Sequence, residues 1–236
     1  MTVDPLPVAR MAALFADPTR MTICLALIDG RAWTAGELAR HAKVSPPTAT
    51  AHLNELVAAG LLSQERQGRH RYLRLAGPSV AQLIEDLATA AGLEVIVPTS
   101  LRTSRVSESL GFARTCYDHL AGRLGVGVMD AMVERGLLKL SAGPALTPDG
   151  EVWLTALAGG AAHTTSTRPV VRPCLDWTER RPHLGGLAGA VVCFGFAARG
   201  WTRQREHERF VTVTPEGDRG IADLLGLDVH ALRSDV

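Results

Sequence analysis

The stretch TAGELARHAKVSPPTATAHLNELVAAG, residues 34–60, predicts two short helices joined by a tight turn. The first helix starts near Glu37, because Leu38, Ala39 and Ala42 then share one face at helical spacing. In the second helix Ser45 has the side-chain oxygen that an N-cap needs, and Pro46 occupies the first helical position, where its missing N–H costs nothing. The apolar positions of this second helix also fall on one face: Ala49, Leu53, Leu56 and Val57.

The opposite face of the second helix carries small and polar side chains, so its backbone can approach base edges and phosphates closely. This pattern predicts a helix-turn-helix whose second helix reads the major groove. We expect Thr48, Thr50 and Asn54 to contact bases, with Ser45 at the N-terminus of the helix and His52 at its flank.

A basic hairpin follows directly. Residues 62–75, LSQERQGRHRYLRL, predict two strands with Gln67 and Gly68 at the tip, after a helix that ends at Gly60. A helix-turn-helix followed by such a hairpin is a winged helix, whose wing cations reach phosphates or the minor groove. The alternative is a solvated edge strand that its charges protect from pairing. The expected wing contacts are Arg66, Arg69, His70 and Arg71.

Charge is distributed unevenly along the chain. The 236 residues carry a net charge of only +1, but residues 31–74 hold seven cations against three anions. This local excess is the electrostatic footprint of a DNA-binding unit. The sequence shows no signal peptide and no uncharged run of the ~18 residues that a membrane span needs, which predicts a cytoplasmic protein without a membrane partner. Its four cysteines lack paired spacing and are expected to be reduced: Cys24, Cys116, Cys174 and Cys193.

The predicted fold is mainly α with small β wings, an α+β class. Residues 1–92 form the expected DNA-binding and dimerisation domain, 93–100 a linker and 101–236 an effector-sensing domain. Helices are predicted at Pro5–Phe15, at Met21–Ile28 in the centre of the core, and at Ser79–Ala91. The apolar stripes of the first and last of these helices suit a dimer face, although packing within the domain is the alternative.

The second half shows a weak internal repeat. Residues 59–83, 135–157 and 199–224 each read as a helix ending in Gly, a short hairpin and another helix. The last two share a helix-start turn, at Thr147–Gly150 and Thr214–Gly217. We expect two degenerate winged-helix-like units in one C-terminal domain, with chance agreement as the alternative. The apolar run His183–Ala198 predicts a buried helix in place of a reading helix.

Two stretches of the second half mix an aromatic residue, a cysteine, a carboxylate and a cation, as ligand pockets do: residues 113–120 and 174–181. The alternative is a polar network in which Asp118 and Asp176 pair with Arg114, Arg180 or Arg181. Cys116 and His119 would share a helix face, but a metal would need Cys174 or His183 as well, so no metal or cofactor is assigned. Thiol redox sensing is a further alternative. The expected pocket residues are Cys116, Tyr117, His119, Cys174, Asp176, Trp177 and Arg180.

Residues 5–92 resemble the arsenic-repressor (ArsR-type) family of winged-helix regulators. The resemblance rests on Ala16–Arg20, Glu37–Ala39, Val44–Thr48, His52-Leu53, Leu56 and Ala59–Leu62. It implies a homodimer that represses from a palindromic operator and releases the DNA on an effector signal. The sequence departs from the metal-sensing members: residues 37–41 lack the cysteine pair of the first motif helix, and residues 80–85 lack the Asp and His ligands of the last helix. Pro46-Pro47 replaces the frequent Gln-Ser, so those two positions lose their expected base contacts.

These observations predict a dimeric DNA-binding repressor released by a small molecule in its C-terminal domain. The alternatives are a metal- or thiol-responsive repressor that uses the C-terminal Cys and His residues, and an architectural DNA-binding protein without an effector. An enzyme is not expected, because the sequence contains no phosphate loop, no Gly-x-Ser-x-Gly and no His-Glu-x-x-His.

Overall fold

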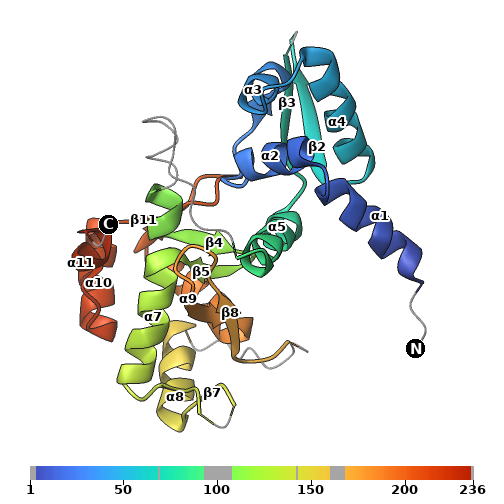
Figure 1. Ribbon diagram of the computed structural model, residues 1–236. Coiled ribbons are helices and arrows are strands. Elements are labelled where there is room, and N and C mark those ends of the chain that lie inside the picture. The colour runs from blue at the N-terminus through green and yellow to red at the C-terminus, as the bar shows by residue number, and fades with distance from the viewer. Residues whose placement is uncertain (1–3, 69, 93–107, 142, 160–167, 235–236) are drawn as a thin grey trace. The chain divides into compact units, whose positions relative to one another are not determined.

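The computed structural model describes residues 4–68, 70–92, 108–141, 143–159 and 168–234 (Figure 1). The chain divides into the units Met1–Ile84 and Glu85–Val236, which are described one at a time. The boundary falls inside helix α5, Pro78–Ala90. The predicted linker 93–100 lies outside the described residues, so the predicted domain limits stay a prediction.

The first unit is built from short helices and a small sheet (Figure 1). The predicted helix Pro5–Phe15 is confirmed as α1, and the predicted core helix is α2. The two motif helices are α3 and α4, and the predicted hairpin is β2–β3. The elements after α1 are α2 Pro18–Ala26, β1 Trp33–Thr34, α3 Ala35–His41, α4 Pro46–Ala58, β2 Leu62–Gln67, β3 His70–Leu75 and α5.

Side-chain caps decide where these helices begin. Asp17 accepts from the backbone of Arg20 at 2.8 Å, and Ser45 accepts from the backbone of Thr48 at 3.3 Å. A capping box starts α3, because Thr34 accepts from the backbone N–H of Glu37 while the Glu37 carboxylate accepts from the N–H of Thr34. These caps satisfy backbone N–H groups of the first helical turn that have no partner within the helix. Each cap therefore marks the residue at which its helix begins.

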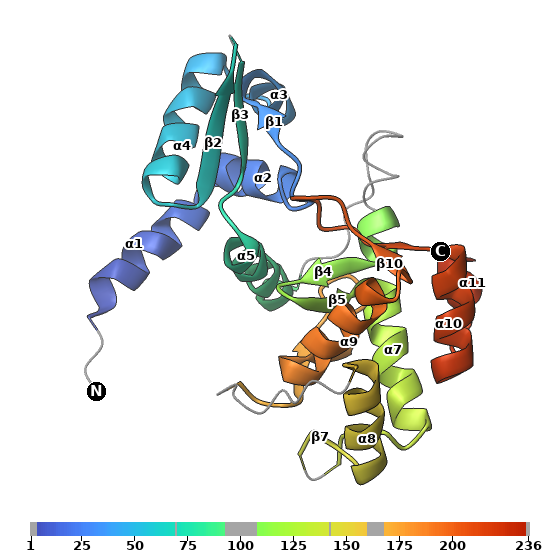
Figure 2. The same ribbon diagram turned by 180° about the vertical axis from the view of Figure 1, so that it is seen from behind.

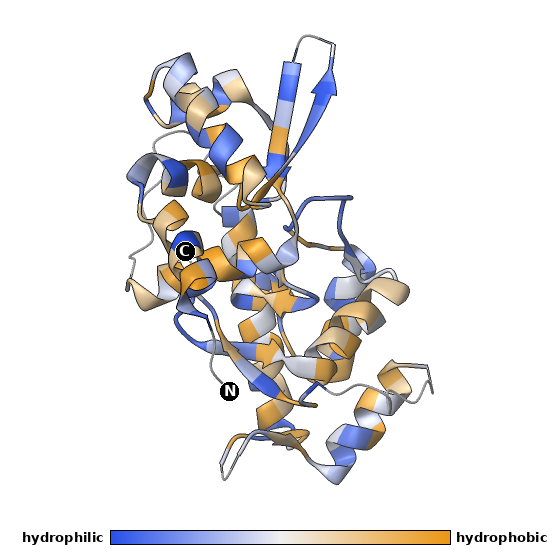
Figure 3. Ribbon diagram, turned by 90° about the vertical axis from the view of Figure 1, so that its right-hand side faces the viewer, coloured by the Kyte–Doolittle hydropathy of each residue, from blue (hydrophilic) through white to orange (hydrophobic). Residues whose placement is uncertain are grey.

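The sheet has the strand order β1-β3-β2, and β1 pairs with β3 at Trp33↔Leu73. This two-residue strand was not predicted, because its apolar pattern is too short to detect. Figure 3 colours β2 and the outer end of β3 as hydrophilic, while Leu62, Leu73 and Leu75 are buried near the base. The hairpin therefore stands on the core at one end and reaches into solvent at the other.

Arginine 20 holds three helices of the first unit together. Its guanidinium donates to the carbonyl oxygen of Leu14 at 2.8 Å, at the end of α1, and to the Glu55 carboxylate of α4 at 2.6 Å. The core beneath is apolar, and its fully buried side chains include Ile23, Leu27, Leu38, Leu53 and Leu56. Helix α4 is thus fixed to its neighbours along its inner face.

The second unit repeats one order of elements, namely hairpin, helix, hairpin, helix. The first copy is β4 Arg114–Cys116, β5 His119–Ala121, α7 Gly122–Glu134, β6 Leu138–Lys139, β7 Ala145–Leu146 and α8 Pro148–Leu157. The second copy is β8 Arg172–Leu175, β9 Pro182–Gly185, α9 Gly186–Ala198, β10 Thr202–Arg203, β11 Thr212–Val213 and α10 Pro215–Leu225, followed by α11 Val229–Ser234. The predicted repeat started one hairpin too late.

The two copies pack crosswise (Figure 2), since α7 lies against β9 and α9 lies against β5. Gly122 and Gly186 start the two helices with φ of 74° and 76°, a left-handed conformation that favours glycine. A side chain there would also collide with backbone, as a Cβ on Gly122 would lie 2.6 Å from the Gly111 oxygen and one on Gly186 2.6 Å from the Pro169 oxygen. Equivalent glycines thus allow equivalent close packing.

The structure corrects the prediction of a single buried helix over residues 183–198. Its first residues form strand β9, and the helix begins only at Gly186. The helix is also not covered on every side, because 75% of Phe194 is exposed. Its inner face does join the core, where Phe196 is fully buried. Among the described residues no helix is both long enough and apolar enough to cross a membrane.

Candidate nucleic-acid interface and cysteine–histidine cluster

The outer face of α4 presents exposed hydroxyl groups at its N-terminal end. The hydroxyls of Ser45 and Thr48 lie 2.8 Å apart, and the Thr50 hydroxyl donates to the Pro46 carbonyl oxygen at 2.8 Å. Because that bond uses the only proton of the Thr50 hydroxyl, Thr50 offers an acceptor and a methyl group outward. This combination suits the exocyclic amines and thymine methyl groups of the major groove.

Asn54, the last predicted base contact, is bonded to the wing. Arg71 of β3 donates to the Asn54 side-chain oxygen at 2.8 Å and to the Gln64 oxygen of β2 at 2.6 Å. Burial, and repulsion by the neighbouring Arg66, lower the pKa of Arg71 from its usual value. The bond leaves the Asn54 amide N–H groups facing outward as donors, so reading helix and wing form one polar surface.

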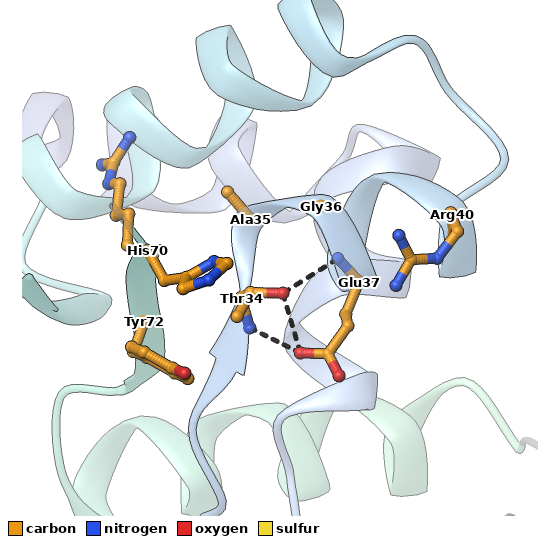
Figure 4. A pocket seen from close by; sticks show the side chains of 8 residues that line it. Thr34, Ala35, Gly36, Glu37, Arg40, His70 and Tyr72 are labelled. Atoms are coloured by element: carbon orange, nitrogen blue, oxygen red, sulfur yellow. Dashed lines mark hydrogen bonds between the residues drawn. The ribbon is translucent and has the colours of Figure 1, made fainter. Parts of the chain in front are cut away.

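The wing carries further cations. Arg66 is exposed and lies opposite Arg71 in the strand register, while Arg69 lies outside the described residues. Figure 4 shows a shallow pocket beside the wing, with His70 and Tyr72 of β3 on one side and Arg40 of α3 on the other. The Glu37 carboxylate also lines this pocket, so its side chains carry charges of both signs.

His52 is turned towards its own unit. Its side chain is 18% exposed, and its Nδ1 lies 3.9 Å from a carboxylate oxygen of Asp17, the cap of α2. Contact between His52 and DNA therefore stays a prediction that the geometry does not strengthen.

Four side chains of the second unit converge on one point. Cys116 and His119 face each other across β4–β5, and Cys174 and His183 face each other across β8–β9. The two sulfurs lie 3.8 Å apart, the two Nε2 atoms lie 3.2 Å apart, and all four possible ligand atoms lie within 4.8 Å of one another. The expectation that Cys116 and His119 share a helix face was wrong, because a tight hairpin brings them together.

A carboxylate stands behind each imidazole of this cluster. His119 Nδ1 lies 3.4 Å from Asp118, and His183 Nδ1 lies 3.0 Å from Asp176. Each ring therefore presents its Nε2 atom to the centre of the cluster. Cys116, His119 and His183 are buried, and Cys174 is half-buried.

A buried ionic network supports the second carboxylate. Asp176 is fully buried and accepts from the Arg114 guanidinium at 2.9 Å and from the backbone of Gly122 at 2.7 Å. Arg114 also lies 3.4 Å from Glu85, which accepts from the Trp177 indole at 3.0 Å. The predicted pairing of Asp176 with Arg114 is confirmed, whereas Asp118 pairs instead with Arg168.

Thiol ionisation differs between the cluster and the remaining cysteines. The Cys116 and Cys174 thiols share a hydrogen bond, and this bond together with the adjacent His119 and His183 lowers the pKa of Cys174. The same bond and burial raise the pKa of Cys116. Burial, with a smaller contribution from the Asp118 carboxylate, raises the pKa of Cys193 to about 11, which disfavours the reactive thiolate.

The other predicted pocket residues lie outside the cluster. Tyr117 is 52% exposed at the tip of β4–β5, with the Arg168 guanidinium 5.8 Å from its ring. Arg180 donates to the backbone of Gly92 at 3.0 Å. Trp177 belongs to the Glu85 network.

The pocket prediction left out His183 as well as the supporting residues Asp118, Arg114 and Glu85. The sequence does contain a signal for the cluster, because Arg-x-Cys-x-Asp occurs at 114–118 and at 172–176, and His-Leu-x-Gly occurs at 119–122 and at 183–186. An alignment of those two segments would have paired the four ligating residues.

One known family matches the first unit of this chain, and one related protein matches nearly its whole length. The family profile described as a helix-turn-helix domain matches residues 15–65. YdfF of Bacillus subtilis, an uncharacterized HTH-type transcriptional regulator, is 38% identical over 212 residues, which cover 89% of this chain and 93% of that protein. A match of that length includes most of the second unit.

Two further similarities each cover little more than a third of the chain. A probable mercury resistance operon repressor of Streptomyces lividans is 34% identical over 80 residues, covering 34% of this chain and 63% of that protein. Among solved structures, the homodimeric winged helix-turn-helix domain of Mb0332 from Mycobacterium bovis, described as a possible ArsR-family regulator, is 28% identical. It covers 38% of this chain and 87% of the other, with a TM-score of 0.35.

Proposed function

Because the chain belongs to the family of HTH-type transcriptional regulators, we propose that it is a dimeric repressor that binds a palindromic operator and leaves it on a signal received by the second unit. The family consists of DNA-binding regulators and not of enzymes, and the ArsR-type resemblance of residues 5–92 agrees with it. A regulator of this kind works on DNA in the cytoplasm.

The observation that carries the proposal is the continuous polar surface of α4 and the wing. Thr48 and Thr50 stand exposed on α4, and the Arg71–Asn54 bond extends the surface to β3. Hydroxyl and amide groups on a helix that enters the major groove supply base readout, and wing cations supply phosphate contacts.

Dimerisation is supported by apolar side chains that the chain leaves exposed. Leu83 and Leu87 of α5 are each 37% exposed, and Val8 of α1 is 64% exposed. Two copies related by a two-fold axis would present two reading helices to half-sites one helical turn apart.

Signal input by the second unit is supported by its buried polar centre. The network Asp176–Arg114–Glu85 ends on α5, the helix that begins in the DNA-binding unit. A change at this centre therefore acts on the same helix that we assign to the dimer face. Deletion of the residues after Ala91 is expected to abolish the signal response, and retention of both dimerisation and response would contradict this assignment.

The test compares operator and random DNA. After selection of the preferred sequence from a random pool, fluorescence anisotropy is measured for Thr50→Ala and for the control Thr155→Ala. Thr155 makes the same kind of bond, to the Glu151 carbonyl oxygen at 2.8 Å, but on α8. Thr50→Ala should cost about 1–3 kcal/mol more on the operator than on random DNA, and Thr155→Ala should change neither. An equal loss on both DNAs would place the reading face elsewhere, and no sequence preference at all would favour an architectural protein.

A further inference from the structure

The four convergent side chains of the second unit have the spacing of a tetrahedral metal site. Zinc–sulfur bonds of about 2.3 Å place two sulfurs about 3.8 Å apart in a tetrahedron, and zinc–nitrogen bonds of about 2.0–2.1 Å place two nitrogens about 3.3–3.4 Å apart. The structure has 3.8 Å between the sulfurs of Cys116 and Cys174, and 3.2 Å between the Nε2 atoms of His119 and His183. The S–S edge and the N–N edge of a zinc tetrahedron therefore agree with the structure, and all four ligand atoms lie within 4.8 Å of one another.

The orientation of the imidazoles also calls for a positive charge between them. Each Nδ1 atom lies close to a carboxylate, at 3.4 Å from Asp118 and 3.0 Å from Asp176, and a proton on Nδ1 would leave Nε2 as the ligand atom. Two neutral imidazoles held in this way would point Nε2 lone pairs at each other. A metal ion between the two Nε2 atoms would accept both lone pairs, and the two sulfurs lie beside the same point.

We propose that Cys116, His119, Cys174 and His183 bind one divalent metal ion of the zinc class in tetrahedral geometry. Two sulfurs and two nitrogens in a tetrahedron are the donor set typical of zinc. All four ligands come from the protein, which is the arrangement of a non-catalytic zinc site. Asp118 and Asp176 are the outer carboxylates that orient ligating histidines.

This metal site joins the two copies of the repeat. One Cys–His pair lies on β4–β5 and the other on β8–β9. The ion therefore holds the two hairpins together at the point where α7 and α9 cross over to the opposite copy. The inference does not depend on repression, because metal binding is measured without DNA.

The first experiment measures the metal content of the full-length protein, purified with reductant and without chelator. Elemental analysis by inductively coupled plasma mass spectrometry should find about one zinc ion per chain, because the four ligands form one tetrahedral site. The double variant Cys116→Ser/Cys174→Ser should lose this metal, and Cys193→Ser, which changes a cysteine outside the cluster, should keep it. Retention of metal by the double variant would overturn the proposal.

The absorption spectrum of the Co²⁺-loaded protein tests the coordination geometry of the metal site. The chelator-treated protein, reloaded with Co²⁺, should show the intense visible bands of tetrahedral Co²⁺ and a thiolate charge-transfer band in the near ultraviolet. Weak octahedral bands, or no change on adding the metal, would contradict a tetrahedral site with two cysteines. His183→Asn should shift the visible bands while leaving the charge-transfer band in place.

A third measurement needs no variant and so does not depend on whether variants fold. Zinc should slow the alkylation of Cys116 and Cys174 by iodoacetamide at least tenfold in the wild-type chain, and EDTA should restore the rate, while Cys193 should respond to neither. Equal alkylation with and without zinc would overturn the proposal. A Cys116–Cys174 disulfide in freshly purified, metal-free protein would instead assign the pair to thiol redox chemistry, because the sulfurs need to close from 3.8 Å to only about 2.05 Å.

Discussion

The Arg71 guanidinium of the wing donates to the side-chain oxygen of Asn54 on the reading helix at 2.8 Å. The same guanidinium holds Gln64 at 2.6 Å, so a single planar group orients polar side chains on α4 and β2. A guanidinium can orient two acceptors at once because its N–H donors point in fixed directions in one plane, whereas the ammonium group of lysine has no such fixed arrangement. The orientation of Asn54 is therefore set before DNA arrives.

The substitution Arg71→Lys keeps the positive charge but removes the planar guanidinium that bonds both Asn54 and Gln64. Operator affinity should fall by about 1–2 kcal/mol, in the range of a lost base contact, while affinity for random DNA, which follows charge, should stay nearly constant. Arg66→Lys is the control, since Arg66 lies opposite Arg71 in the register and is exposed. Anisotropy titrations on both DNAs decide the matter, and a parallel fall on both would reduce Arg71 to a phosphate contact.

Unlike Arg71, the wing residues Arg66 and Arg69 should act through charge alone. Arg66→Ala and Arg69→Ala should each weaken binding about equally on operator and random DNA, because phosphates carry no sequence information. The slope of log affinity against log salt should become shallower by about one for each variant. A salt series for wild type and both variants gives these slopes, and unchanged slopes would remove the wing from the interface.

The exposed leucines of α5 should control assembly. Leu83→Glu/Leu87→Glu should convert the dimer to a monomer in sedimentation equilibrium and remove operator binding, because a charged pair cannot be buried in a dimer face. Val152→Glu on α8 is the control, since Val152 is 72% exposed but lies outside the proposed face. A double variant that remains dimeric would place the dimer face on another surface.

The outer carboxylate Asp118 offers a gentle test of the metal site, because 35% of its side chain is exposed. Asp118→Asn should weaken zinc affinity about 10–100-fold, the usual effect of removing an outer carboxylate, and leave the stoichiometry at one. Competition with a chromophoric chelator measures the affinity. Asp130→Asn, which breaks only the exposed pair with Arg181, should bind zinc as the wild type does.

Two arginine–aspartate pairs of the second unit differ mainly in burial. Arg114 and Asp176 have side chains 1% and 0% exposed, whereas Arg181 and Asp130 are 59% and 39% exposed. Arg114→Met removes the buried cation that Asp176 and Glu85 share and leaves Glu85 only Arg209 as a cationic partner, so it should cost on the order of 3–5 kcal/mol of unfolding free energy. Arg181→Met should cost under about 1 kcal/mol. Urea denaturation measures the free energy of unfolding of both variants. Equal losses would contradict the prediction that the buried arginine contributes more to stability than the exposed one.

The first unit could be predicted almost completely, because its information is local. Asp17, Ser45 and Pro46 mark helix starts within a few residues of the apolar stripes that they precede. The α+β class and the helix-turn-helix follow from those signals. Strand β1 escaped prediction because two residues carry no detectable period.

The cluster of the second unit could not be assembled from local signals. Cys116 and Cys174 are separated by 58 residues, and only the crosswise packing of the two copies brings them together. The apolar pattern also assigned His183 to a helix, whereas it lies on strand β9. The short strand and the helix that follows form one continuous apolar run, so the pattern does not separate them. Side chains that meet through tertiary packing need either a structure or a recognised repeat.

The crosswise repeat has a consequence for the origin of this domain. The hairpins β4–β5 and β8–β9 each contribute one cysteine and one histidine, so a half-length chain with one such hairpin would complete the same four-residue set by pairing with a second copy of itself. Fusion of two such copies would place both halves in one polypeptide. Once joined, the halves are free to diverge, as they have at their carboxylates: Asp118 pairs with Arg168, and Asp176 pairs with Arg114.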